Sequence, residues 1–389
     1  MRRSLVLIIS IVIVALPATS HALAPINDNF ADAIALSEPL TATASASTVD
    51  STTETGEPVP SCIDNGEFGA SVWYKYTPSV DVSAGVDTVF SGTGYDTVLA
   101  IYTGAALDSL NEIACNDEIS SNPATFGFSR AAAILQGGTT YHIQVSGFEG
   151  DTGDLNLRLT RRRTTPAVVR GDKWFLNQGF NGQSEFSFNF GSGNDDPFTG
   201  TFLGFLFGQT GVSAPTVRDG NVWFMNDWFD ASSFVARAYG RSSDFPVAGD
   251  RDGDGGFDIG VRRSNTWHFD TDFDGVTDET FAYGLSTDYP LMGDWDGDGD
   301  FTPGIRRGNK WFLNNNTDAN ADVVITYGSS TDFPIVGDWN GDGIWTIGVV
   351  RGNNWLLTNS TGPNASLVFA YGSASDFPLV GDWDIVVEE

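Results

Sequence analysis

The stretch Phe245-Pro246-Val247-Ala248-Gly249-Asp250-Arg251-Asp252-Gly253-Asp254-Gly255 decides the fold of this 389-residue chain, because its pattern recurs with a strict period. The same Phe/Tyr-Pro-x-x-Gly-Asp pattern returns every 44 residues, at residues 289–294, 333–338 and 377–382. A short apolar segment that ends in glycine and aspartate is typical of a strand running into a tight turn. Strands and turns repeated at this period predict a β-propeller or a β-solenoid.

A series of tryptophans keeps the same 44-residue period, at Trp223, Trp267, Trp311 and Trp355, and Trp174 precedes the series by 49 residues. Each repeat offers about four short strands, and in the last repeat we expect them at residues 347–351, 354–358, 367–371 and 378–383. Four strands per unit favour a propeller blade over a solenoid coil. The five tryptophan strands therefore predict a five-bladed β-propeller.

The two ends of the repeat region are complementary. It starts at the strand of residues 168–170, with no Phe-Pro strand before it, and its last recognisable segment is a Phe-Pro strand at residues 377–382. We therefore expect the last strand to complete the first blade. This pairing would close the ring and remove both exposed sheet edges.

The turn after the quoted strand has the pattern of a calcium loop. Asp250, Asp252 and Asp254 stand at positions 1, 3 and 5, Gly255 at position 6 and Asp258 at position 9. Alternate residues can point oxygen atoms at one centre, and glycine permits the sharp bend. Without a cation, carboxylates about 4 Å apart repel by roughly 1–4 kcal/mol per pair. Oxygen ligands without histidine or cysteine favour Ca²⁺ over zinc or copper.

The other repeats carry incomplete versions of this loop. The second has Asp294, Asp296 and Asp298, with threonine at position 9, and the third has Asp338, Asn340 and Asp342. A fourth keeps two aspartates, Asp382 and Asp384, whereas the corresponding segment at residues 198–212 has lost the acids. We expect calcium occupancy to fall in that order. A hairpin with Asp270, Asp272, Asp274 and Asp278 repeats the spacing at another turn, where a metal is less expected.

These repeats resemble FG-GAP-type, integrin-like propellers of bacterial exported proteins. The resemblance covers about residues 168–384 and rests on Gly293-Asp294-Trp295-Asp296-Gly297-Asp298-Gly299 and Gly337-Asp338-Trp339-Asn340-Gly341-Asp342-Gly343. Each motif is followed by a Gly-aliphatic-x-Arg strand and then by a tryptophan strand. The resemblance implies a propeller over residues 168–389 with calcium loops. It implies little about function.

Residues 25–160 have a different pattern of short alternating strands, which predicts a β-sandwich. In residues 140–146 the apolar residues alternate with polar ones, so we expect the polar ones to face outward. A further strand is expected at residues 87–90. The two cysteines, Cys62 and Cys115, are expected to form a disulfide that contributes roughly 3–4.5 kcal/mol. Buried free thiols are the alternative.

This N-terminal region also resembles a known family, the bacterial pre-peptidase C-terminal type of domain. The resemblance rests on Asn27-Asp28-Asn29-Phe30, Ser71-Val72-Trp73-Tyr74, and residues 95–104, 114–117 and 138–145. It implies a jelly-roll-like β-sandwich, usually an accessory domain of exported proteins. Residues 161–167 then read as a linker. Its three arginines, Arg161, Arg162 and Arg163, suit a solvated linker, a protease-sensitive joint or a tether to an acidic rim.

Residues 1–22 have the layout of a secretory signal: two arginines, an apolar run at residues 5–16, and small residues before the expected cut. The run is too short for a membrane span, which needs about 20 residues. Without the signal, 18 basic residues face 50 acidic ones, a formal charge of −32. This charge argues against nucleic acid and anionic membranes as partners.

No nucleophile elbow, zinc-ligand cluster or phosphate loop occurs in the sequence, so we expect no enzyme activity. The first hypothesis is a secreted or cell-surface adhesion or scaffolding protein that binds an extracellular polymer, protein or carbohydrate. The second is a lectin-like carbohydrate binder, suggested by Trp228, Phe229 and Trp345 near the repeat loops. The third is an accessory subunit or remnant of an exported hydrolase.

Overall fold

The computed structural model describes residues 24–38, 40–63, 68–89, 95–118, 127–200, 213–226, 234–252 and 256–383. The described chain is all-β, with two short 3₁₀ turns, η1 (Phe30–Asp32) and η2 (Leu107–Ser109). The expected signal at residues 1–22, the ligand Asp254, and Trp228, Phe229 and Asp384 lie outside the described residues. None of the described helices is long and apolar enough to cross a membrane.

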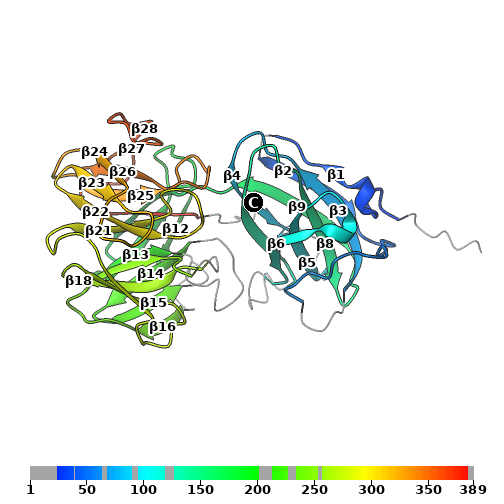
Figure 1. The fold of residues 1–389 in the computed structure, drawn as a ribbon, viewed down its shortest axis with the longest axis horizontal. Helices are drawn as coiled ribbons and strands as arrows, with labels where there is room; N and C mark the ends of the chain where they lie inside the picture. Colours follow the sequence, from blue (N-terminus) through cyan, green and yellow to red (C-terminus); the bar gives the residue numbers. More distant parts are fainter. Residues whose placement is uncertain are drawn as a thin grey trace, which may run out of the picture.

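The N-terminal strands form two sheets, which lie together on one side of the molecule in Figure 1. The first has the order β1 (Ile34–Ala35), β3 (Phe68–Tyr76), β8 (Tyr141–Phe148), β5 (Thr97–Thr103) and β6 (Asn111–Asn116). The second has the order β2 (Thr41–Ser47), β9 (Asp154–Arg161), β4 (Val82–Asp87) and β7 (Arg130–Leu135). All neighbours are antiparallel except β1 and β3.

One hydrophobic core joins these two sheets. Val72 and Val145 from the first sheet pack with Val86 and Leu157 from the second, and all four are almost completely buried. The alternation of β-strands explains this core, because every second side chain of each strand points to the same face. Two sheets whose apolar faces share a core are a stable way to bury both.

The outer face of the first sheet is also covered, which corrects one expectation. His142, Gln144 and Ser146 on β8 were expected to face solvent, but at most 8% of each is exposed. The N-terminal segment contacts this face: the ring of Phe30 lies 4.4 Å from that of His142 in a tilted contact and 5.2 Å from that of Trp73 in an edge-on contact. A second small core of buried aromatic and apolar residues therefore lies on this face.

The expected disulfide is present between Cys62 and Cys115, with their Cα atoms 5.7 Å apart. It ties a loop to β6. The expected strand at residues 87–90 is wrong in its position, because β4 ends at Asp87. The side chain of Asp87 is instead buried and bound by Arg158, whose guanidinium donates two hydrogen bonds at 2.6 and 2.9 Å.

The repeat region forms five four-stranded antiparallel sheets on the other side of the molecule (Figure 1). Sheet 1 contains β10 (Thr165–Arg170), β11 (Lys173–Leu176), β12 (Phe186–Asn189) and β29 (Phe377–Gly381). Sheet 2 contains β13 (Asp196–Gly200), β14 (Ala214–Asp219), β15 (Val222–Asn226) and β16 (Phe234–Ala238). Sheet 3 contains β17 (Phe245–Gly249), β18 (Asp258–Arg263), β19 (Thr266–Asp270) and β20 (Glu279–Ala282).

Sheet 4 contains β21 (Tyr289–Gly293), β22 (Thr302–Arg307), β23 (Lys310–Leu313) and β24 (Val323–Thr326). Sheet 5 contains β25 (Phe333–Gly337), β26 (Thr346–Arg351), β27 (Asn354–Leu357) and β28 (Leu367–Ala370). Each sheet carries one tryptophan of the periodic series, on the strand next but one to its Phe/Tyr-Pro or Asp-Pro edge strand. These strands are β11, β15, β19, β23 and β27, and all five tryptophans are completely buried. The 44-residue period therefore corresponds to one sheet.

The expected pairing of the last strand with the first is present. Strand β29 pairs with β10 in antiparallel register, with Phe377 opposite Val169 and Gly381 opposite Thr165. Sheet 1 is therefore built from both ends of the repeat region. Each Phe/Tyr-Pro strand lies at the edge of its sheet. Proline fits there because an edge strand does not need every backbone N–H for pairing.

Hydrogen bonds also link each sheet to the next in a cyclic order, between backbone groups at four junctions and through an arginine side chain at the fifth. Asp250 O accepts from Phe301 N and Asp294 O from Trp345 N, which link sheets 3, 4 and 5. Asp338 O accepts from Thr164 N just before β10, and Asp382 O from Ser213 N, so the order continues from sheet 5 to sheets 1 and 2. Between sheets 2 and 3, Arg218 donates to the carbonyl oxygens of Asp244 and Arg241.

Candidate metal centres

The acidic loops join the first and second strands of sheets 3, 4 and 5. We call residues 250–258 loop I, residues 294–302 loop II and residues 338–346 loop III, and we call the segment after β29 that begins at Asp382 loop IV. Position 1 of every loop is an aspartate at the end of a Phe/Tyr-Pro strand, and Asp250, Asp294 and Asp338 are each at most 6% exposed. The strand ends thus hold one buried carboxylate in each of loops I, II and III.

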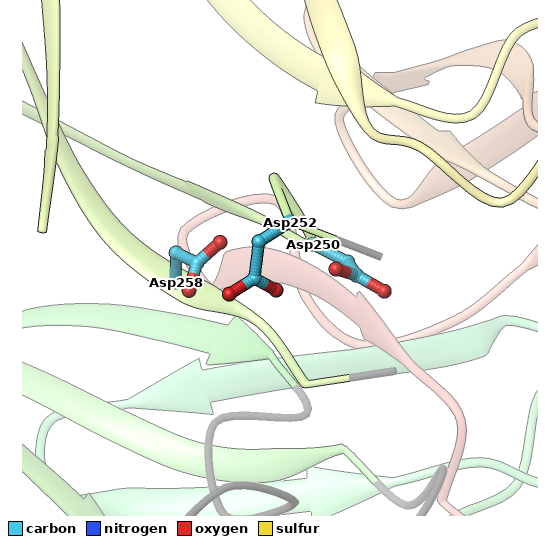
Figure 2. Close-up of side chains that lie close together, drawn as sticks. All are labelled: Asp250, Asp252 and Asp258. Atoms are coloured by element: carbon cyan, nitrogen blue, oxygen red, sulfur yellow. The ribbon is translucent and has the colours of Figure 1, made fainter. Parts of the chain in front are cut away.

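Loop I brings three of its four expected ligands together. One carboxylate oxygen each from Asp250, Asp252 and Asp258 lies within 4.8 Å of the other two, as Figure 2 shows for the three side chains. Asp258 also accepts a hydrogen bond from the backbone N–H of Arg251 at 2.7 Å. The guanidinium of Arg251 points away to Glu279, at 2.8 and 2.9 Å.

Loop II places the oxygens of Asp294, Asp296 and Asp298 within 4.8 Å of one another. Asp294 is anchored by the backbone N–H groups of Gly297 at 2.7 Å and Gly299 at 3.0 Å. Both glycines have positive φ, which lets the chain bend around the carboxylate. Burial, with the charges of Asp298 and Asp296, raises the pKa of Asp294 to about 6 despite these hydrogen bonds. A bound cation would relieve this repulsion.

Position 9 of loop II does not point into the cluster. The hydroxyl of Thr302 donates to Gly293 O at 3.4 Å, so it caps the strand instead. The absence of a carboxylate at this position makes the ligand set of loop II smaller than that of loop I.

Loop III supplies two carboxylates and one amide. Asp338 accepts from the N–H groups of Gly341 and Gly343 at 2.7 and 2.8 Å, and burial raises its pKa to about 6. The Oδ1 atom of Asn340 is buried and accepts no hydrogen bond within the described part of the chain. An oxygen left without a donor at position 3 fits a site in which a cation would take that place.

The three arginines of residues 161–163 contact loops III and IV and the ring of Phe180. These contacts bear on whether the segment is a solvated linker or a tether to an acidic rim. Arg161 donates to Asn340 O at 3.1 Å, and Arg162 forms an ion pair of 2.5 Å with Asp382. Arg163 lies over the ring of Phe180 at 4.9 Å. These contacts agree with a tether to an acidic rim and not with a solvated linker. They also give Asp382 a cationic partner from the protein itself.

The hairpin of sheet 3 forms a further acidic group. Oxygens of Asp270, Asp272 and Asp278 lie within 4.8 Å of one another, and Asp270 is completely buried. Burial raises the pKa of Asp270 to about 6, although the N–H groups of Asp274 and Gly275 donate to it. The equivalent positions of the other sheets hold buried Asn177, Asn226, Asn314 and Thr358. A buried polar side chain at this turn is therefore a shared structural feature.

Aromatic residues near the loops pack between sheets. Trp345 lies half-buried against Phe301 at 4.7 Å and Phe257 at 6.3 Å, in edge-on and tilted contacts. These contacts assign Trp345 to the junction of sheets 3, 4 and 5 and not to an exposed sugar-binding platform. Comparison with known proteins gave no match, either to a protein-family model or to a curated protein.

Proposed function

We propose that this protein is an exported, non-catalytic binding or scaffolding protein, secreted or held at the cell surface. Its repeat would form a five-bladed β-propeller, and residues 25–160 a jelly-roll-like β-sandwich. The pairing of β29 with β10 and the cyclic bonding of the five sheets support a propeller. A solenoid does not bond its last unit to its first, because each repeat contacts only its neighbours in sequence. The disulfide supports an oxidising compartment.

Calcium at loops I, II and III is the proposed cofactor. The observation that carries this proposal is the approach of three carboxylates within 4.8 Å in loop I, and again in loop II. Ca²⁺ accepts six to eight oxygen ligands in flexible geometry, whereas Mg²⁺ demands a smaller octahedral site and retains water. Extracellular modules of this kind bind Ca²⁺ at about 10⁻⁴–10⁻³ M.

The role proposed for calcium is structural. Each loop also provides the carbonyl that bonds the next sheet, such as Asp250 O with Phe301 N and Asp294 O with Trp345 N. A cation that fixes the loop would therefore also fix the junction between sheets. Rigid junctions suit a protein that presents a broad surface to an extracellular polymer, whether protein or carbohydrate. The acidic charge argues against nucleic acid as that polymer.

Thermal unfolding of the full chain in 2 mM calcium and in excess EGTA tests the cofactor. We expect a higher melting temperature in calcium, because binding only the folded state stabilises it by mass action. Asp252→Asn and Asp296→Asn should each reduce this difference, and Asp108→Asn, an exposed aspartate of the sandwich, should not. Equal melting temperatures in calcium and EGTA would remove calcium from the proposal.

Binding of the intact protein to insoluble polymers tests the scaffolding role. Collagen, cellulose, chitin and peptidoglycan are incubated with the protein in calcium or EGTA, and bound protein and released soluble product are both measured. We expect retention on a polymer, lost in EGTA, with no release of product. Release of product would favour the hydrolase hypothesis and contradict the non-catalytic one.

A further inference from the structure

A cavity of about 990 Å³ follows the Phe/Tyr-Pro strands of sheets 1, 3, 4 and 5 and the corresponding strand β13 of sheet 2, which begins Asp196-Pro197. At one end it reaches loops I–III and linker residues 162–164. The other end is framed by the first residue of each of these five strands. We call this end the aromatic mouth and define it by those residues: Asp196, Phe245, Tyr289, Phe333 and Phe377.

Four of the five residues of the aromatic mouth are rings in contact with one another. Phe245 contacts Tyr289 at 5.1 Å, Tyr289 contacts Phe333 at 6.0 Å, and Phe333 contacts Phe377 at 5.2 Å, all in edge-on geometry. The rings do not bury one another, since 38% of Phe245 and 39% of Phe377 remain exposed. Exposed π faces gathered around one opening attract cations through their quadrupoles.

The fifth residue of the mouth is a carboxylate. Asp196 lies opposite Arg218 in sheet 2, as Phe245 lies opposite Arg262 in sheet 3. Cross-strand partners share a face, so Asp196 projects from its sheet as Phe245 does from the next. Arg218 is near enough to feel the charge of Asp196, but its guanidinium donates to the carbonyl oxygens of Asp244 and Arg241 at 2.9 and 2.6 Å.

The aspartates that precede these strands are paired with arginine in every sheet except sheet 2. In sheets 1, 3, 4 and 5 a guanidinium nitrogen of an arginine lies 2.6–2.8 Å from a carboxylate oxygen of the aspartate that precedes the Phe/Tyr-Pro strand. The pairs are Arg170–Asp376, Arg263–Asp244, Arg307–Asp288 and Arg351–Asp332. In sheet 2 the corresponding residues are Asp195 and Asp219, which are both acidic. Among the described residues no ion pair reaches Asp195, Asp196 or Asp219. The unpaired carboxylates around the opening therefore all belong to sheet 2. The guanidiniums of Arg218, Arg262 and Arg306 lie buried behind the mouth and donate to backbone carbonyl oxygens of the neighbouring sheets.

We propose that the aromatic mouth binds an organic cation, an alkylated ammonium group that is either free or carried at the end of a longer molecule. This inference rests on the proposed ring of five sheets and names a ligand class for it. The four rings supply π faces and Asp196 supplies the counter-charge. An anion would be repelled by the three aspartates of sheet 2. A calcium ion needs six or more oxygens, which the mouth does not provide.

A comparison of choline with 3,3-dimethyl-1-butanol isolates the charge. The two molecules have nearly the same shape, but the second has carbon in place of the ammonium nitrogen. Both are titrated into the full chain in calcium, with binding measured by calorimetry and by line broadening of the methyl proton signal. We expect choline to bind on the order of tenfold more tightly, the effect of a cation–π contact reinforced by one carboxylate. A third titration with N-acetyl-trimethyllysine amide distinguishes a carried cation from a free one.

Two variants connect the binding to the mouth. Asp196→Asn should weaken choline about five- to tenfold and leave the uncharged isostere unchanged, whereas Phe377→Leu should weaken choline about threefold. The exposed Asp108→Asn in the sandwich removes the same charge and serves as the control. Equal affinity for choline and its isostere, no binding of choline at 20 mM, or equal effects of Asp196→Asn and Asp108→Asn would overturn the inference.

The outcome is separable from the calcium proposal. Failure of choline binding with a calcium-dependent melting temperature would overturn only the assignment of the mouth. Choline binding by a protein whose melting temperature does not change with calcium would overturn only the assignment of calcium as the cofactor.

Discussion

Replacement of Arg262 by valine should weaken the junction between sheets 3 and 4. Arg262 is only 5% exposed, and its guanidinium lies 5.5 Å from the centre of the Trp267 ring. It donates to Asp288 O at 2.7 Å and also to Leu285 O, both in the turn that precedes β21. Arg218 and Arg306 make the same contacts from sheets 2 and 4. Val169 and Val350 hold this position in sheets 1 and 5, so valine fits the strand.

The magnitude follows from what Arg262→Val removes. Two hydrogen bonds from a charged donor contribute roughly 1.5–3 kcal/mol each, and the contact with Trp267 up to about 2 kcal/mol. Burying the charged guanidinium costs free energy, as the lowered pKa of Arg262 indicates. The valine variant no longer has this desolvation cost, which offsets part of the lost stabilisation. Two carbonyl oxygens would remain without a donor. We expect a net loss of about 2–4 kcal/mol in the free energy of unfolding.

Urea unfolding followed by tryptophan fluorescence, at a fixed saturating calcium concentration, measures this loss. Lys310→Val is the control, because Lys310 is exposed on β23 and the change there should stay within about 0.5 kcal/mol. A loss below about 1 kcal/mol for Arg262→Val would refute the reasoning, since the hydrogen bonds across the junction would then contribute little to stability.

Two further predictions concern the disulfide and pH. The double variant Cys62→Ser/Cys115→Ser should lose about 3–4.5 kcal/mol of stability, because the bridge closes a loop with a separation of 53 residues; a melting temperature equal to that of the parent would contradict this. In EGTA, the folded state holds Asp294 and Asp338 with pKa values raised to about 6. Between about pH 4 and 6 the folded state therefore binds more protons than the unfolded state. The chelated protein should therefore melt at a higher temperature at pH 5 than at pH 7, and a lower value at pH 5 would count against it; calcium should reverse this order, because its ligands must be deprotonated.

The repeat region could be predicted well from the sequence because its signals are local and recur. Strand β29, expected at residues 378–383, is present at Phe377–Gly381, and its pairing with β10 followed from the unequal ends of the repeat. Asp294, Asp296 and Asp298 converge because their spacing within one turn determines where they point. Position 9 differs, since the hydroxyl of Thr302 turns back to its own strand.

Contacts between distant segments were beyond the reach of sequence patterns. The alternation in β8 is typical of a half-buried strand, but Phe30, more than a hundred positions earlier, covers His142 on the other face. Likewise, nothing in the local sequence of Asp382 indicates that Arg162 neutralises it, although the run of three arginines was a signal for such a tether. The fifth residue of the aromatic mouth, Asp196, is recognisable only after the register of β13 is known.

The closed order of the five sheets is the central claim, and hydrogen exchange at β29 tests it most directly. Peptides that cover residues 377–381 of the full chain are compared by mass spectrometry with those of β25, residues 333–337, the same strand of the preceding repeat. We predict equal protection of the two strands from exchange, because β29 pairs with β10 as β25 pairs with β26. Exchange at β29 that is orders of magnitude faster than at β25 would show a frayed strand and an open array of sheets, and would contradict the claim.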